Sequence, residues 1–345
     1  MNHFYILDEH SKVIVGNLTV ECEVCYQQCT SIGCLVQSCK LYNRNRRQGL
    51  VTNAKCKIFF CDITKTTKLF REKINALLYA FPDISFIKNE IEKRIRDFEQ
   101  KKVNRLVHNL SSINARNIQS IYNIVPQDVL SSNWRNQIEF IRKEMVNNPD
   151  KVANTLLRLS KNNIHMKSEF SIYRKLEREE KTRLEFKSYQ LKTIILNVLH
   201  TFFVDLSNNG IFVNVEDYFG KVKIDYETIQ VAIYHLLDNA TKYTKSNSTV
   251  DITFNEYQNK INANFIMTSI YVKPEERQSV FNEGISGSIA KEMGRNGDGI
   301  GMWRIKQMLK LNNGEFTANF GDKLETIDGC DYAVNSFFLT FQKFM

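Results

Sequence analysis

Glycine is absent from the middle of this 345-residue chain. None of its 14 glycines lies between Gly49 and Gly210, and three of the 4 prolines fall in that interval. A long stretch without glycine is typical of helices, because glycine is the weakest helix former after proline. We therefore expect the middle of the chain to be mostly helical.

Long apolar runs are also missing. The most apolar helical stretch, Thr193 to Leu206, includes Asn197, His200 and Asp205, so it is too short and too polar to cross a bilayer. The first residues have neither the basic start nor the apolar run of a signal peptide. These absences predict a soluble, cytoplasmic protein with no membrane span.

Composition and charge exclude further classes of protein. Hydrophobic residues make up 43% of the chain and charged residues 25%, which are globular values and exclude disordered and collagen-like chains. The 47 Lys and Arg against 38 Asp and Glu leave a net charge of +9, which permits an anionic partner. The basic residues are spread out and no zinc-finger or helix-turn-helix pattern is present, so a nucleic-acid partner is not expected.

Seven of the 8 cysteines lie between Cys22 and Cys61. A cytoplasmic protein does not normally keep structural disulfides. The alternatives are a zinc or iron–sulfur site, a redox sensor, or free and partly buried thiols, and the spacing matches no standard metal motif well. The candidate metal ligands are Cys22, Cys25, Cys29, Cys34 and Cys39. We expect Cys56, Cys61 and Cys330 to be core residues.

The chain is predicted to have three parts. Residues 1–70 form a small cysteine-rich domain, residues 71–183 a helical domain, and residues 184–345 a mixed α/β domain. The first part contains three short strand-like runs: Phe4 to Leu7, Val13 to Val15 and Ile58 to Phe60. The basic segment 40–57 has no acidic residue and is interpreted as a solvated face rather than a docking site for an anion.

The helical part contains two long amphipathic helices. Apolar residues recur at steps of three and four from Lys88 to Val125, and Pro126 is expected to end or kink that helix. Trp134 to Met145 predicts a further helix, and another long one follows the turn at Pro149. A helical hairpin with one broad apolar stripe usually buries it against a second copy, which predicts a dimeric four-helix bundle.

The last part carries two motifs that suggest phosphate chemistry. Ile229 to Thr244 reads IQVAIYHLLDNATKYT, an amphipathic helix with Asn239 near its polar side, and Gly297 to Met302 reads GDGIGM and opens another helix. A glycine run before a helix offers backbone N–H groups and a positive dipole end to an anion. An Asn carboxamide facing it can complete a Mg²⁺ shell with phosphate oxygens and waters. The P-loop pattern and the dinucleotide fingerprint are both absent.

These residues resemble the GHKL (Bergerat-type) ATP-binding domain of the sensor histidine kinases of two-component systems. HLLDNATKYT resembles their N box, Phe281 their F box, and Gly297 to Met302 their second glycine box. The resemblance spans roughly residues 184–345 and implies a C-terminal α/β sandwich that binds ATP and Mg²⁺. It also implies a dimerising hairpin upstream, whose first helix carries the phosphorylated histidine; His108 lies on the matching helix.

The resemblance assigns roles residue by residue. Asn239 would hold Mg²⁺ with ATP, Lys242 would contact phosphate, and Tyr243 would lie near the base or ribose. Phe281 would belong to the nucleotide site, and residues 282–298 would form a lid over ATP. The glycines that would wrap the phosphates are Gly297, Gly299 and Gly301.

Three positions depart from the family pattern. The first glycine box normally supplies an Asp that reads adenine, but segment 264–270 has neither Asp nor Gly. Thr268, Ser269, a backbone group or a water must then read the base, or binding must be weak. His235 stands where the N box often has Asn. Asn109 follows His108 where the family usually has an acid, and Asn cannot act as a base.

The resemblance implies a histidine kinase that phosphorylates His108 and passes the phosphate to an aspartate of a response-regulator receiver domain on another chain. One alternative is a GHKL signalling adaptor that has lost catalysis. Another is a conformational ATPase that forms no phosphohistidine.

Overall fold

A computed structural model describes residues 2–29, 35–177, 184–294 and 298–343. The chain divides into two compact units, Met1–Lys101 and Lys102–Met345. Helix α2 (Thr67–Tyr122) begins in the first unit and ends in the second. None of the helices among the described residues combines the length and the apolar character that a membrane span requires.

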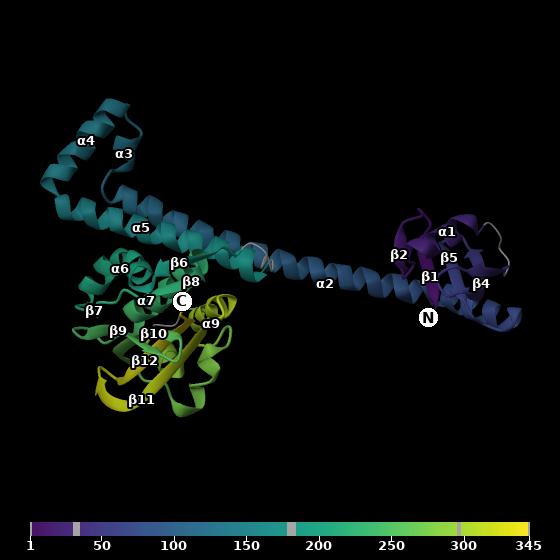
Figure 1. The fold of residues 1–345 in the computed structure, drawn as a ribbon. Helices are drawn as coiled ribbons and strands as arrows, with labels where there is room; N and C mark the ends of the chain where they lie inside the picture. The colour runs from purple at the N-terminus through teal and green to yellow at the C-terminus, as the bar shows by residue number, and fades with distance from the viewer. Residues whose placement is uncertain (1, 30–34, 178–183, 295–297, 344–345) are drawn as a thin grey trace. The chain divides into compact units, whose positions relative to one another are not determined.

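The first unit contains a five-stranded antiparallel sheet in the order β2-β1-β5-β4-β3 (Figure 1). Its elements are β1 (His3–Asp8), β2 (Val13–Gly16), α1 (Val20–Gln28), β3 (Leu35–Cys39), β4 (Arg44–Thr52) and β5 (Cys56–Asp62). The strands expected near Phe4, Val13 and Phe60 are confirmed as β1, β2 and β5. Ile58 and Phe60 pack against Phe70 of α2, which places the start of the long helix on one face of the sheet.

The interpretation of segment 40–57 as a solvated face is wrong for Arg46. This side chain is 1% exposed, and its Nε donates to Cys61 Sγ at 3.2 Å. Its guanidinium also lies 4.7 Å from the centre of the Tyr42 ring. The sequence hid this role because β4 reads RNRRQGLVT, with no apolar alternation in its first half.

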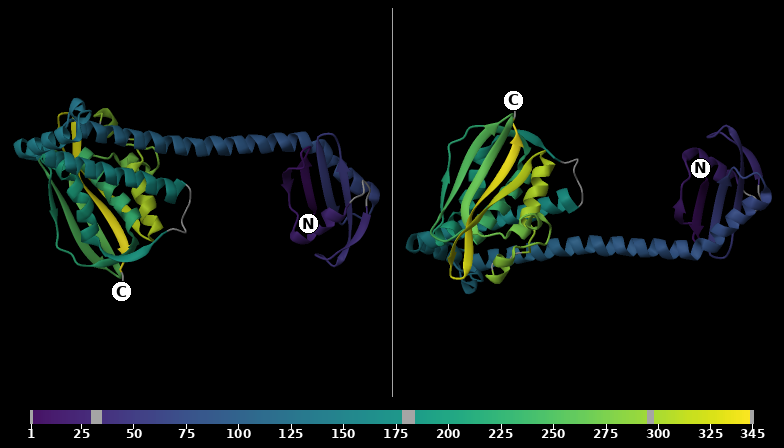
Figure 2. Two further views of the ribbon diagram at one scale, coloured as in Figure 1. Left: turned by 90° about the horizontal axis from the view of Figure 1, so that it is seen from above. Right: turned by 90° about the horizontal axis from the view of Figure 1, so that it is seen from below.

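The second unit begins with the end of α2 and a helical return. This return consists of α3 (Gln127–Leu130), α4 (Trp134–Asn147), α5 (Pro149–Ile172) and a π-helical turn at Tyr173–Glu177. The helices expected from Trp134 and Pro149 are confirmed; Asn133 caps α4 by accepting from the Asn136 N–H. The end of α2 and α5 run side by side in opposite directions (Figures 1 and 2). This is the predicted hairpin within one chain.

The rest of the second unit is a mixed α/β domain, as predicted. Its five-stranded sheet has the order β11-β12-β10-β9-β7, and helices α6, α7 and α9 pack on one face. The elements are β6 (Phe186–Gln190), α6 (Leu191–Asn208), β7 (Phe212–Val215), β8 (Lys221–Asp225), α7 (Tyr226–Tyr243), β9 (Thr249–Tyr257), β10 (Lys260–Ile270), α8 (Ser288–Glu292), α9 (Gly301–Leu311), β11 (Glu315–Ile327) and β12 (Cys330–Gln342). This layer fixes the last turn of α7 opposite the first turn of α9.

Candidate functional site

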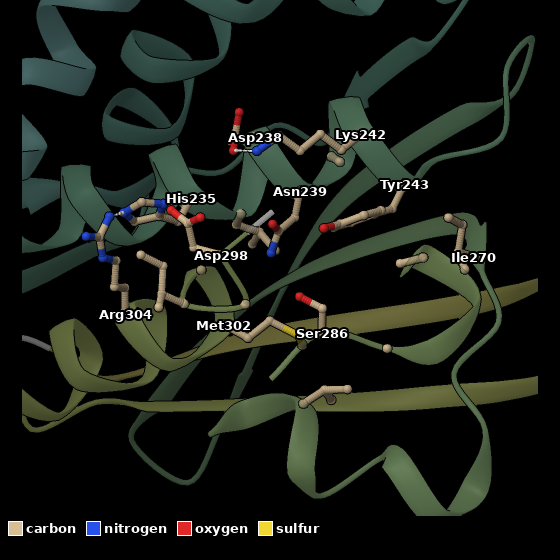
Figure 3. Close-up of a pocket in the computed structure, with 18 of the residues that line it drawn as sticks. His235, Asp238, Asn239, Lys242, Tyr243, Ile270, Ser286, Asp298, Met302 and Arg304 are labelled. Atoms are coloured by element: carbon tan, nitrogen blue, oxygen red, sulfur yellow. Dashed lines mark hydrogen bonds and ion pairs between the residues drawn. The ribbon is translucent and has the colours of Figure 1, made fainter. Parts of the chain in front are cut away.

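One cavity of about 310 Å³ lies in the second unit between the helical hairpin, α7, the start of α9 and one end of the sheet (Figure 3). Two helices of the hairpin contribute to it: Asn109, Ser112 and Arg116 from α2, and His165 and Glu169 from α5. The cavity therefore has a hairpin side, a helix side and a strand side.

Helix α7 presents the residues of the HLLDNATKYT motif to this cavity. Its apolar face is buried in the core, and Asp225 caps its start by accepting from the Thr228 N–H. Asn239, Lys242 and Tyr243 lie on its last turns and line the cavity. Lys242 Nζ donates to Asp238 Oδ2 at 2.6 Å, so its cation is held at the rim (Figure 3).

The start of α9 faces Asn239. Among the described residues, no side chain donates or accepts a capping hydrogen bond at Ile300, the residue before this helix. Its first N–H groups are then available to an anion in the cavity. A Cβ at Gly301 would lie 3.2 Å from Asn239 Oδ1; the missing side chain thus brings this backbone against the carboxamide.

The strand side of the cavity is an apolar slot with one polar pair. Met267, Ile270, Phe320 and Phe337 supply the apolar surface, and Ser269 and Asn335 the polar groups. Asn335 Nδ2 donates to Ser269 Oγ at 2.9 Å and to the Ile270 carbonyl at 3.2 Å. Asn335 Oδ1 accepts from the Gly321 N–H at 3.2 Å. Ser269 and Asn335 are the polar side chains that strands β10 and β12 offer to a planar aromatic group in this slot.

A buried ion pair joins the hairpin to α9. Arg304 Nη1 and Nη2 donate to the two Glu169 carboxylate oxygens at 2.6 and 3.2 Å, and Asn109 Nδ2 donates to the same carboxylate at 2.8 Å. Glu169 and Arg304 are 3% and 4% exposed. Burial acts to raise the pKa of Glu169, but His165, Arg304 and Asn109 together hold it well below its usual range. Glu169 is therefore ionised and fully engaged.

His235 completes this network from α7. Its Nε2 lies 3.5 Å from Arg304 Nη1; because a guanidinium only donates, Nε2 acts as the acceptor. Burial, followed by the charge of Arg304, lowers the pKa of His235 to about 3. The imidazole is neutral at physiological pH.

A neutral buried histidine makes stability fall on acidification. Since the folded pKa is about 3 and the unfolded value about 6.5, the unfolded chain takes up the extra proton between these values. The contribution is complete above pH 6.5 and falls by about 2 kcal/mol at pH 5. We expect His235→Asn to lose less stability than wild type between pH 7.5 and pH 5, measured as the melting temperature. Equal losses would contradict a buried neutral imidazole.

The structure places the remaining candidates as follows. Asn239, Lys242, Tyr243, Gly299 and Gly301 line the cavity together. Gly297 lies outside the described residues. Phe281 is not among the lining residues; it packs behind them against Phe316 and Phe320, with ring centres 5.6 and 6.2 Å apart. His108 is exposed on α2, directly before the lining residue Asn109.

The candidate cysteine ligands do not form a metal site in the part of the chain that the structure describes, where no group of three or more His, Cys, Asp or Glu is placed to hold an ion. Cys22 and Cys39 are buried free thiols, Cys29 is buried, and Cys25 is half-buried. Cys34 falls in the segment outside the described residues. Cys56, Cys61 and Cys330 are buried, as expected.

Sequence reasoning missed Glu169, Arg304 and Asn335. Each interrupts an otherwise apolar face: Glu169 lies between Met166 and Ile172 on α5, Arg304 lies four residues before Met308 on α9, and Asn335 lies between Ala333 and Phe337 on β12. A charged or amide group on a buried face is a signal of a paired polar site. The sequence does not show which residue pairs with each of these groups.

Comparison with known proteins gives partial matches. No family model matches the chain. The sensor protein SrrB of Staphylococcus aureus is 27% identical over 90 residues, which are 26% of this chain and 15% of that protein, and the match recurs in several strains. The chain thus spans only a small part of this relative's length.

Among solved structures, the catalytic domain of histidine kinase ThkA is 16% identical, with a TM-score of 0.37 over 46% of this chain and 97% of that domain. The Acinetobacter baumannii histidine kinase AdeS is 12% identical, with a TM-score of 0.38 over 69% of this chain and 97% of that chain. The sequence match is therefore to a sensor protein, and both of these structures are of histidine kinases.

Proposed function

Because the chain is similar to sensor histidine kinases, we propose that it is a kinase that binds Mg-ATP and phosphorylates His108. One observation carries the proposal: a single cavity is lined by Asn239, by the open N-terminus of α9, and by the residue next to His108. The groups that would bind phosphate and the proposed histidine nucleophile therefore belong to the same unit of the fold.

The residues present are suited to Mg²⁺ held with nucleotide rather than by protein alone. The described residues contain no carboxylate cluster of the kind that forms a protein cage, while Asn239 supplies an oxygen donor beside the α9 backbone. Mg²⁺ usually keeps waters and binds few protein groups when it accompanies phosphates. Asn239 would hold the ion, which offsets negative charge on the phosphoryl groups. Gly299, Gly301 and the first N–H groups of α9 would bind the phosphates, and the apolar slot that Phe320 and Phe337 line would take the base.

In the reaction, a His108 ring nitrogen forms a bond to the γ-phosphorus while the bond to the bridging oxygen breaks, and ADP leaves. The base that usually follows the histidine is replaced by Asn109, which donates to Glu169. Glu169 is a poor base while Arg304 holds both of its oxygens. A base role for Glu169 requires Arg304 to separate from it.

The phosphohistidine would pass its phosphate to an aspartate of a response-regulator receiver domain. The kinase itself would be a homodimer of this chain. Val107, Ile118 and Leu156 on the hairpin helices are 55%, 41% and 58% exposed, and such an apolar surface favours dimerisation through the hairpin. We also propose that the first unit is a sensor or docking domain.

Labelling with γ-labelled ATP and Mg²⁺ tests the function directly. We expect wild type to take up acid-labile, alkali-stable label, and His108→Ala and Asn239→Ala to reduce it to background. His200→Ala is the matched control, because His200 is an exposed histidine on α6, and it should label as wild type does. Label that survives His108→Ala would refute the assignment of the phosphoacceptor.

The second candidate is a signalling adaptor that binds nucleotide without phosphoryl transfer. Asn109 favours it, because the position after the nucleophile is occupied by a group that cannot take a proton. Wild type that binds ATP but takes up no label with or without its receiver partner would support the adaptor.

A further inference from the structure

The strand wall of the cavity carries no carboxylate among the described side chains that line it, and Ser269 and Asn335 are its polar groups. Ser269 lies on β10 between Thr268 and Ile270. Alternate residues of a strand point to opposite faces. Met267 and Ser269 line the cavity and Thr268 does not, while Ile270 joins the lining where the strand ends. Of the two hydroxyls in segment 264–270, only Ser269 is placed to meet a ligand.

The hydrogen bonds of Asn335 fix its orientation. Its Nδ2 faces the Ile270 carbonyl, which only accepts, and its Oδ1 faces the Gly321 N–H, which only donates. The amide therefore cannot be reversed. Because Nδ2 also points at Ser269 Oγ at 2.9 Å, Ser269 accepts from Asn335.

This arrangement leaves the Ser269 hydroxyl with its proton and one lone pair for further hydrogen bonds. A hydroxyl has one donor and two acceptor lone pairs, and Asn335 uses one lone pair. Within the described part of the chain, no acceptor is recorded for the Ser269 proton. The hydroxyl can therefore donate to a ligand or accept from it, whereas an ionised carboxylate only accepts.

We propose that the Ser269 hydroxyl, held by Asn335, reads the base in this cavity and admits purine triphosphates with either a 6-amino or a 6-keto group. The inference rests on the proposed nucleotide-binding function and concerns the choice of base. A 6-amino group donates to the free lone pair of Ser269, and a 6-keto group accepts its proton. A carboxylate at this position would repel the keto oxygen.

Calorimetric titration of the full chain with Mg-ATP and Mg-ITP tests this. The two bases differ at position 6 and in the protonation of the adjacent ring nitrogen, and they share the triphosphate. We expect dissociation constants within tenfold of each other for wild type. A preference for ATP above tenfold would overturn the proposal, while labelling of His108 by ATP would leave the kinase function intact.

Two variants distinguish recognition of the base by Ser269 from the overall affinity for nucleotide. Ser269→Ala should weaken both nucleotides by about 3- to 10-fold, the effect of one lost neutral hydrogen bond, and keep their ratio. Ser269→Asp should raise the preference for ATP over ITP by about 10-fold or more, because a carboxylate only accepts. An unchanged ratio in Ser269→Asp, with binding retained, would overturn the role of Ser269. If wild type binds neither nucleotide nor inorganic tripolyphosphate, both this proposal and the kinase proposal fail.

Discussion

Glu169→Gln should lower the melting temperature of the chain by at least about 6 °C. The substitution leaves Arg304 buried at 4% exposure without its anionic partner. Removing one member of a buried ion pair costs about 3–5 kcal/mol, because the remaining charge is desolvated and uncompensated. For a domain of this size, each kcal/mol corresponds to about 2–4 °C.

The loss of stability should come from the contact between the hairpin and α9, because the ion pair joins these elements. Glu169 belongs to α5, Arg304 to α9, and the third member, Asn109, to α2. The carboxylate therefore connects both helices of the hairpin to the helix that follows the glycine segment. Since its pKa is held far below the usual range, its contribution is complete above about pH 4.3 and is lost as pH falls through the lower folded value. The effect of the variant should be the same at pH 6 and pH 8.

Glu185→Gln is the matched control for this measurement. The same atoms change, but Glu185 is 75% exposed and its partner Lys187 is 65% exposed, with 2.9 Å between Nζ and Oε2. Exposed pairs contribute little to stability because solvent screens them, so a shift below about 3 °C is expected. Equal shifts for the two variants, by differential scanning calorimetry, would show that the Glu169 pair does not join these helices.

The local features of the site were predictable because each depends on a few consecutive residues. The last turn of α7 with Asn239 follows from one amphipathic helix. The start of α9, proposed to bind phosphate, follows from glycines placed directly before a helix. Their meeting in one cavity was expected only through the family resemblance. The start of a helix at the Pro149 turn was also predictable, because proline favours the first helical position.

The polar contacts across the cavity were not predictable in the same way. Glu169 meets Arg304 from 135 positions away, and Ser269 meets Asn335 from 66 positions away. The second contact depends on the register of β10 against β12, in which Ser269 pairs with Ala333. Shifting that register by one residue would turn Asn335 to the opposite face of the sheet. A single sequence does not state such a register.

Gly299→Ala should weaken ATP binding by about 100-fold, the largest effect expected from adding one methyl group. Gly299 has φ +67° and lines the cavity. Its added Cβ would lie 2.7 Å from the carbonyl carbons of Gly284 and Ile285, and these are backbone atoms that cannot rotate aside. The loop must shift. A displacement of about 1 Å in a positioning group costs about 100-fold in reaction rate, and we expect a loss of the same order in affinity when the displaced groups are those that would hold the phosphates.

Gly294→Ala separates this close approach from backbone strain. Gly294 also has a left-handed φ, +63°, but a Cβ there would meet no atom of the described residues within 4 Å. Both variants therefore carry the conformational cost of a left-handed alanine, and only Gly299→Ala forces two backbone segments apart. We expect the affinity for ATP to change less than about 3-fold in Gly294→Ala. If both variants lose affinity equally in calorimetric titration, strain alone explains the loss. A difference of about 30-fold or more would mean that Gly299 is required because the chain passes too closely behind the phosphate site for any side chain.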